Sequence, residues 1–370
     1  MAIEKYSRIS RVLIAALFAG IALLGKPSLC ADSAKSVVEL NLENYDGKVT
    51  KFTGRTDHAV VILSDDTVWA VFPTASKEGS LYRSPGYGFL HISRSGERIS
   101  QCIWPVPAGY AVEDFFPRVS GGFVIQTSSS LISLSSECKE EASIPSTEDI
   151  PAATSDGASL ILKEDRGLRI LDAASLRERG VISLPAGLQD FHRVRVWNRL
   201  VLIQPGQTLS IAPCYWTHWP PLSNSQPQTW HSMPCPEEIM TTFGDGAVIV
   251  SNWNAASPNI SLYNLHGVLL RRFPVDESMT TDQSMFPDDS CSSPLSSRVG
   301  VFLFDQKRTW LRQEKITGEH VSVIDLARGR TLLSLPVTYD DPLLNCSLSQ
   351  DGKTFAVLRG LILSIFEVPE

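Results

Sequence analysis

The sequence predicts an all-β fold, a seven-bladed β-propeller closed by pairing an N-terminal strand with the C-terminal blade. Three observations lead to this prediction. Residues 345–369 contain three short β-type runs, separated by turns at Asp351-Gly352 and Gly360, which is the density of an antiparallel meander. Units of this kind recur along the chain. A strand left over near the N-terminus matches a last unit that is one strand short, and pairing the two removes both free edges.

The first residues predict a targeting segment, 1–31. Lys5, Arg8 and Arg11 precede an apolar run from Val12 to Gly25, and Ala31 suits a cleavage site. The run is too short for a membrane helix, which needs about 20 residues, so we expect a cleaved signal peptide and a single exported domain, 32–370. An uncleaved anchor is the alternative. No later run is long enough to span, so we expect no membrane span after cleavage and a secreted or periplasmic protein.

The charge of the chain limits its partners. The full sequence carries 33 Lys and Arg against 40 Asp and Glu. Removing the segment takes away four basic residues and one acidic residue, which leaves 29 against 39, a net charge of about −10. An acidic chain without Lys/Arg runs is a poor ligand for nucleic acid or an anionic membrane.

The repeated unit is a hairpin that runs into proline. Each copy has an apolar run, a polar or Gly-containing turn and a second run, and the copies end at Pro107, Pro145, Pro185, Pro274, Pro336 and Pro369. Proline lacks a ladder donor and therefore suits the end of an edge strand. A further copy is expected to end near Pro220–Pro221, which gives seven units in all.

Further apolar runs precede these hairpins and are expected to face the centre of the ring. They are 59–63 with 67–72, Phe115 with 122–126, 158–163, 194–204, 247–252 and 299–304. Four strands in each unit give the length of a propeller blade, about 35–45 residues. The strand left over is 36–42, and we expect it to complete the last blade beside 361–368.

Two of these units carry the resemblance to a known family. VSVIDLARGRTLLSLP and LSQDGKTFAVLRG, within Val37–Pro369, make the chain similar to the secreted seven-bladed WD40-like propellers of bacteria. The Gly-His and Trp-Asp dipeptides of eukaryotic WD repeats are absent from the sequence. The resemblance implies the propeller architecture, without the hydrogen-bond network of those dipeptides.

Two stretches, 213–236 and 275–297, are predicted as loop inserts on a face of the propeller. The first combines proline and polar residues with several aromatic rings. Such rings offer a stacking surface for a protein, a peptide or a sugar; the alternative is that they form the loop's own small core. The binding residues predicted here are Tyr215, Trp216, His218, Trp219, Trp230 and His231.

Six cysteines remain after the signal peptide, and an even number in an exported chain predicts disulfides. We expect Cys214–Cys235 from their proximity, and Cys102–Cys138 and Cys291–Cys346 from the remaining pairs, although six cysteines allow 15 connectivities. The spacing Cys214, His218, His231, Cys235 also allows a tetrahedral zinc site. Because export favours oxidation, we predict the disulfide, no metal and no cofactor.

Recognised catalytic motifs are absent from the sequence, including the nucleophile elbow, the zincin helix and the phosphate-binding loop. Runs 158–162, 247–250 and 299–304, taken as innermost strands, are overwhelmingly apolar, which disfavours an enzyme. We therefore predict a monomeric, non-enzymatic scaffold that binds a protein or peptide. The alternatives are a glycan ligand and a propeller hydrolase or lyase that acts on glycans.

Overall fold

The computed structural model divides into two units, Met1–Ala34 and Lys35–Glu370. The described residues all belong to the second unit and are 36–46, 59–62, 66–74, 86–145, 151–154, 156–164, 167–185, 188, 191, 193–197, 200–204, 213–219, 229–233, 239–243, 247–252, 259–274, 283–292, 296–308, 314–337 and 343–370. The predicted targeting segment lies outside them. In the described part of the chain, no helix is long and apolar enough to cross a membrane.

The described strands pair into seven four-stranded antiparallel sheets. The first three are β2–β5 (Ala59–Ile62, Val68–Pro73, Gly86–Ile92, Arg98–Pro105), β6–β9 (Val112–Pro117, Phe123–Thr127, Ser130–Leu134, Glu140–Pro145) and β10–β13 (Ala152–Ala153, Ser159–Glu164, Gly167–Asp172, Glu178–Ser183). The next three are β14–β17 (Arg193–Trp197, Leu200–Gln204, Cys214–His218, His231–Met233), β18–β21 (Ile239–Phe243, Ala247–Asn252, Asn259–Tyr263, Leu269–Pro274) and β22–β25 (Gln283–Ser292, Arg298–Arg308, Glu314–Asp325, Arg330–Val337). The last sheet has the order β1-β28-β27-β26, from Val38–Asn41, Ile362–Glu367, Thr354–Arg359 and Leu343–Leu348, and a short helix, α2 (Glu43–Asp46), follows β1.

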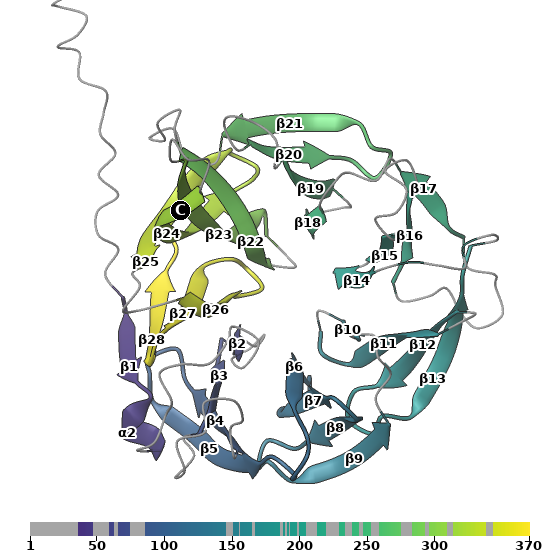
Figure 1. Ribbon diagram of the computed structural model, residues 1–370, viewed down its shortest axis with the longest axis vertical. Helices are drawn as coiled ribbons and strands as arrows, with labels where there is room; N and C mark the ends of the chain where they lie inside the picture. The colour runs from purple at the N-terminus through teal and green to yellow at the C-terminus, as the bar shows by residue number, and fades with distance from the viewer. Residues whose placement is uncertain are drawn as a thin grey trace, which may run out of the picture. The chain divides into compact units, whose positions relative to one another are not determined.

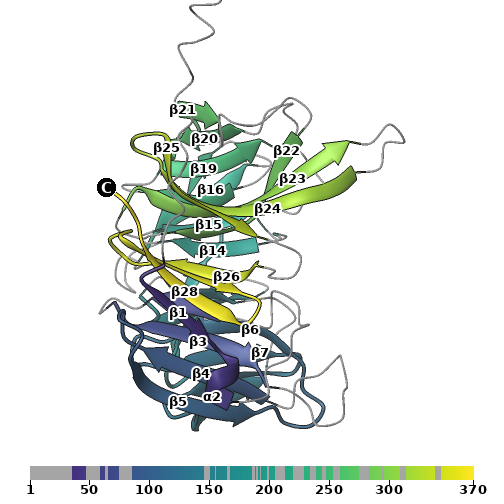
Figure 2. The ribbon, with the colours of Figure 1, turned by 90° about the vertical axis from the view of Figure 1, so that its left-hand side faces the viewer.

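The sheets stand side by side in a ring (Figure 1). In six of them the first strand is nearest the centre, and in the last sheet β26 is nearest the centre and β1 is outermost. Viewed from the side, strands β23 and β24 reach beyond the neighbouring sheets (Figure 2). These two are the longest strands described, with 11 and 12 residues.

The hydrophobic core lies between consecutive sheets. In β3, the side chains of Val68, Ala70 and Phe72 pack against the last sheet, whereas Trp69 and Val71 pack against β6–β9. Successive side chains of a strand point to opposite faces, and here both faces are covered. This explains why the middle strands read as continuous apolar runs without polar alternation.

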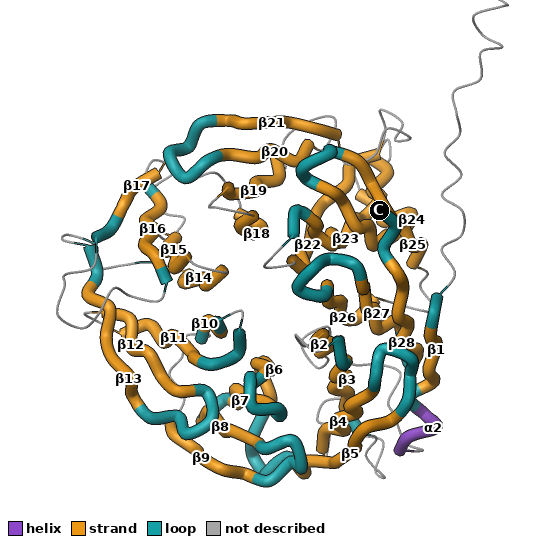
Figure 3. The backbone as a smooth tube through the Cα atoms, turned by 180° about the vertical axis from the view of Figure 1, so that it is seen from behind, coloured by secondary structure: helices purple, strands orange, loops and turns teal. Residues whose placement is uncertain are grey.

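The two ends of the described chain meet in one sheet, which Figure 3 shows from behind. Strand β1 pairs antiparallel with β28, with Val38 opposite Ile365 and Leu40 opposite Leu363. Leu42, just beyond β1, is fully buried in the core that the last sheet shares with β2–β5. This is the pairing that the sequence predicts between 36–42 and the last strand.

Hairpins between the third and fourth strands share one local design. In the β4–β5, β8–β9, β12–β13, β20–β21 and β24–β25 hairpins the fourth strand carries one extra residue just after the turn: Ile99, Glu141, Arg179, Leu270 and Leu332. A bulge of this kind interrupts the ladder and increases the local twist. These outer edges are therefore irregular where they leave the turn, which hinders edge-to-edge aggregation.

Specific contacts join every pair of neighbouring sheets around the circuit. Starting from β2–β5 they are Cys102–Cys138, Ser133 Oγ to Ala173 O, Trp230 Nε1 to Ser183 O, Trp216 Nε1 to Leu265 O, Arg271 to Ala327 O, Cys291–Cys346, and Ile62 N to Ser347 Oγ. Two of these are the disulfides predicted from the sequence, and both pairings are confirmed, with Cα–Cα distances of 5.9 and 6.0 Å.

The two predicted loop inserts are wrong in part. Residues 214–218 and 231–233 are strands β16 and β17, and residues 283–292 form β22. Prolines and polar residues suggested loops, but the strands stop short of most of these prolines. In β16 the polar side chain of Thr217 is satisfied by donating to the main-chain oxygen of Thr229, at 2.8 Å.

The predicted innermost strands are wrong as well. Residues 159–162, 247–250 and 299–304 belong to β11, β19 and β23, each the second strand of its sheet, and residue 158 directly precedes β11. The innermost strands are β10, β18 and β22, as Figure 1 shows. Second strands are apolar because neighbouring sheets cover both of their faces, so this apolarity says nothing about the side chains that line the centre of the ring.

Candidate functional site

The predicted binding residues gather on the two outer strands of the β14–β17 sheet. Tyr215, Trp216 and His218 lie on β16, His231 begins β17, and Trp219 and Trp230 stand at the two ends of the connection between them. This connection, 219–230, is longer than its equivalents at 93–97, 135–139, 173–177, 264–268 and 326–329. The sequence predicted one loop insert over 213–236; β16 and β17 lie within that range, and residues 220–228 between them lie outside the described residues.

Trp216 is a structural residue. Its side chain is 5% exposed and packs with Cys214 and Met233 against the next sheet. Its indole Nε1 donates a hydrogen bond to the main-chain oxygen of Leu265, at 3.1 Å. A buried indole N–H needs such a partner, so Trp216 joins two sheets and is not presented to a ligand.

Tyr215, Trp219 and Trp230 lie on the other side of the same sheet. All three are partly buried and pack against the core shared with β10–β13. Trp230 also donates from its indole Nε1 to the main-chain oxygen of Ser183, at 2.7 Å. The two ends of the 219–230 connection are thus fixed to the neighbouring sheet by aromatic side chains.

The two histidines are the exposed members of the set. His231 stacks on Trp216, with ring centroids 4.3 Å apart, and the His218 ring is nearly perpendicular to the same indole, with centroids 5.4 Å apart. The structure therefore does not assemble all six predicted residues into one aromatic platform. It places two exposed imidazoles over one buried indole, beside an enlarged turn.

The alternative zinc site is incompatible with the state of Cys214. This cysteine is disulfide-bonded, so it offers no thiolate to a metal. Cys235, its predicted partner and the fourth predicted ligand, lies outside the described residues. Among the residues that are described, no group of three or more His, Cys, Asp or Glu is placed to hold a metal ion.

Carboxylates on the innermost strands bear on the alternative glycan-cleaving function. Strand β6 carries Glu113, which is exposed, and Asp114, whose carboxylate accepts a hydrogen bond from the Phe115 N–H at 2.7 Å. Glycoside hydrolysis needs two carboxyl groups that flank one bond. The side chains of Asp288 and Asp289 on β22 lie outside the described set, so Glu113 and Asp114 are the only carboxylates described on the innermost strands.

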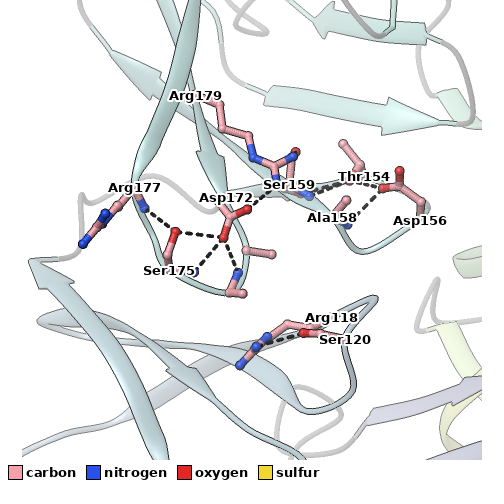
Figure 4. Close-up of polar contacts among 12 residues, drawn as sticks. Arg118, Ser120, Thr154, Asp156, Ala158, Ser159, Asp172, Ser175, Arg177 and Arg179 are labelled. Carbon is pink, nitrogen blue, oxygen red and sulfur yellow. Dashed lines mark hydrogen bonds and ion pairs between the residues drawn. The ribbon is translucent and has the colours of Figure 1, made fainter.

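A polar cluster that sequence analysis missed covers the turns of the β10–β13 sheet (Figure 4). Asp172 Oδ1 accepts hydrogen bonds from the Ser175 N–H at 2.7 Å and the Ser175 hydroxyl at 2.9 Å, and its other oxygen pairs with Arg179. Burial alone would raise the pKa of Asp172, but these hydrogen bonds and the Arg179 guanidinium together lower it below its ordinary value. Asp172 is therefore ionised in the folded protein down to an unusually acidic pH.

The same arrangement recurs, which identifies it as a structural device. Asp325 Oδ1 accepts from the Ala327 and Arg328 N–H groups, at 3.0 and 3.1 Å, and Asn264 Oδ1 accepts from the turn that follows it. These are Asx turns, in which a side chain mimics a main-chain acceptor. The signal in the sequence is an Asp or Asn at the end of the third strand of a unit.

One glycine in this region is required by close packing. Gly157 has a φ of +66°, and a Cβ at this position would lie 2.7 Å from the main-chain oxygen of Pro117 in the neighbouring sheet. Its own main-chain oxygen accepts from the Val119 N–H at 3.0 Å. The turn before β11 thereby docks directly on the turn after β6.

No protein-family model matches the sequence, and no match is found among curated proteins. Solved structures are similar in fold. One is a chain in the crystal structure of the mitotic checkpoint complex, with a TM-score of 0.52 and 8% identity over 94% of this chain and 99% of that chain. Another is the WD40 domain of Neurospora crassa Pan2, with a TM-score of 0.50 and 9% identity over 92% and 97%.

The chain has a WD40-like β-propeller fold. At identities this low the similarity concerns the fold alone, since propellers host many unrelated functions. Any activity must therefore be argued from the residues described above.

Proposed function

We propose that this protein is an exported, non-enzymatic propeller scaffold that binds a protein or peptide at the outer edge of the β14–β17 sheet. Each four-stranded sheet is taken as one blade, so that the ring has seven blades and β1 closes it. The disulfides Cys102–Cys138 and Cys291–Cys346 support export, because such bonds persist in oxidising compartments.

One observation carries the proposed site. The connection 219–230 is enlarged where the equivalent turns are short, and both of its ends are fixed by partly buried tryptophans. Loops held on a rigid scaffold are where propellers and other β folds place their binding residues. The exposed His218 and His231 beside this connection offer donors, acceptors and aromatic faces to a partner.

The choice of a protein or peptide over a glycan substrate rests on the chemistry of the described residues. Imidazole and indole groups supply hydrogen-bond donors and aromatic contact area, which are features of protein–protein interfaces. Cleavage of a glycan would need two carboxyl groups that flank one bond, and on the innermost strands only the adjacent Glu113 and Asp114 are described. We therefore retain the binding function and treat glycan binding as an outcome of the test.

Affinity capture with quantitative mass spectrometry tests this function. The full chain and a His218→Ala/His231→Ala variant are used as baits for the exported proteins of the source organism, and recovered partners are then tested in purified form. His266→Ala is the matched control, since His266 is an exposed histidine in the equivalent turn of the next sheet. We expect the double variant to lose the partner and the control to retain it. Equal recovery by all three baits would disprove the site.

A further inference from the structure

A run of exposed apolar residues leads into strand β21. Val268, Leu269 and Leu270 are 57%, 44% and 56% exposed. Among the described residues these are the only large exposed hydrophobic side chains that follow one another in sequence. At the equivalent place, β9 has Glu140 and Glu141. Exposed apolar groups in succession indicate a surface that is covered by a partner.

Arginines border this apolar surface. Arg271 and Arg272 follow it directly and are exposed. The guanidinium of Arg271 donates to the main-chain oxygens of Ala327 and Arg328, at 2.6 and 3.2 Å. This contact places the 326–329 turn beside β21, and with it the exposed side chains of Arg328 and Arg330.

The combined surface is basic in an acidic protein. Segments 259–274 and 321–337 together hold four arginines, and their only acidic residue is Asp325. Asp325 is 4% exposed and already accepts hydrogen bonds from its own turn. Asp325 also pairs with Arg328, Oδ2 to Nε at 3.6 Å, and Arg330 donates to the main-chain oxygen of Glu370 at 2.6 Å. The two segments nevertheless carry three more arginines than carboxylates, whereas the whole chain has a net charge of −7.

We propose that β21 and the 326–329 turn form a second interaction surface, for an extended acidic segment of a partner protein that carries apolar side chains. Its apolar side chains cover Val268, Leu269 and Leu270, and its carboxylates pair with Arg272 and Arg328. Guanidinium groups bind carboxylates in a bidentate manner, which suits this pairing. The surface is distinct from the β16–β17 edge and does not depend on the proposed function of that edge.

A second copy of this chain is a poorer occupant. Edge-to-edge pairing of two β21 strands would bring Arg271 and Arg272 of the copies close to one another, and like charges on paired strands destabilise a sheet. The extra residue at Leu270 also interrupts the edge, and bulges of this kind oppose continuous pairing. An acidic partner segment avoids both penalties.

Fluorescence anisotropy with a labelled synthetic peptide tests the surface. The probe is a peptide in which Leu and Glu alternate, and a peptide in which Leu and Lys alternate is the charge control. We expect the full-length protein to bind the Glu peptide at least about tenfold more tightly than the Lys peptide, and to bind it more weakly as salt rises. Equal binding of the two peptides, or no binding of the Glu peptide, would overturn the proposal.

Two variants locate the binding. Leu270→Glu places a charge at the extra residue of β21, and we expect it to weaken binding of the Glu peptide about tenfold. Ile99→Glu is the matched control, because Ile99 occupies the same bulge position in β5 and is 52% exposed; we expect it to bind like the parent. Equal loss in both variants would refute the location.

Vesicles of phosphatidylcholine with and without phosphatidylglycerol test whether the surface binds an anionic membrane instead of a protein. Binding to the anionic vesicles without binding to the Glu peptide would assign the surface to a membrane and disprove the proposal. Circular dichroism of both variants, expected to match the parent, shows that each has folded.

Discussion

The indole Nε1 of Trp216 donates to the main-chain oxygen of Leu265, and this hydrogen bond of 3.1 Å joins two neighbouring sheets of the ring. The two residues lie 49 positions apart in the sequence. Trp216, one of the predicted binding residues, therefore stabilises the contact between two sheets. The exposed histidines beside it are what remains for a partner.

Replacing Trp216 with Phe is expected to lower the stability of the protein while leaving partner binding intact. The phenyl ring is smaller than the indole and leaves part of its space empty, and the Leu265 oxygen loses its donor; the lost hydrogen bond alone costs about 1–2 kcal/mol. Urea unfolding measures the loss. His218→Ala is the control and should change the free energy of unfolding by less than about 0.5 kcal/mol, because His218 is exposed. If Trp216→Phe abolished binding without loss of stability, the structural role would be wrong.

Removing one disulfide tests the contact between the first two sheets. Cys102 and Cys138 are 36 residues apart. The double change Cys102→Ser/Cys138→Ser is expected to lower the free energy of unfolding by about 2–4 kcal/mol, because the unfolded chain gains conformational entropy when the cross-link is lost. Thermal unfolding of the parent and the variant gives the difference. Peptide mapping without reductant should recover 102 linked to 138 and 291 linked to 346; any other pairing would contradict the structure.

The pH dependence of stability should report on Asp172. Its folded-state pKa is lowered, so its stabilising contribution is fully present above the unfolded value, for which 3.8 is the reference, and is lost as pH falls through the folded pKa. Asp172→Asn should therefore be less stable than the parent at about pH 6, and the gap should narrow at about pH 3. The urea midpoints of the parent and the variant at several pH values measure this difference in stability. Glu178→Gln, on the exposed edge of β13, is the control, and a gap that widened on acidification would refute this role.

The pairing of β1 with β28 is tested through Leu42. This side chain is fully buried between the last sheet and β2–β5, so Leu42→Ala is expected to cost about 2–4 kcal/mol. Val37→Ala, at a residue 52% exposed just before β1, should cost less than about 0.5 kcal/mol. Urea unfolding compares the two. Equal stability of both variants would show that the N-terminal strand does not hold the last sheet together.

Much of the fold follows from local signals. The turn at Asp351-Gly352, with Gly352 at φ +70°, and the proline that ends β9 at Pro145 fix where strands begin and stop. The disulfide pairs Cys102–Cys138 and Cys291–Cys346 were also predictable, because each pair joins neighbouring units. These features depend on residues close together in the sequence or in adjacent repeats.

The errors share a physical cause. Strands β11, β19 and β23 were expected at the centre because they are apolar, yet a strand covered on both faces is apolar wherever it stands in the sheet. Strand β16 was expected as loop because 213–236 is rich in prolines and polar residues, but Thr217 finds its acceptor on Thr229 and Trp216 its acceptor in the next sheet. Local composition does not reveal partners that only the assembled ring brings close.

By itself, the sequence determined that this protein is built from repeated antiparallel strands and that strand 36–42 is available to the last unit, because turn residues and apolar runs act over a few positions. Only the tertiary structure decided which strand of each sheet is innermost, that Trp216 is buried while His218 and His231 are exposed, and that four arginines meet an apolar edge at β21. Those outcomes depend on how neighbouring sheets cover one another, and that covering joins residues too distant in the chain for any local pattern to record.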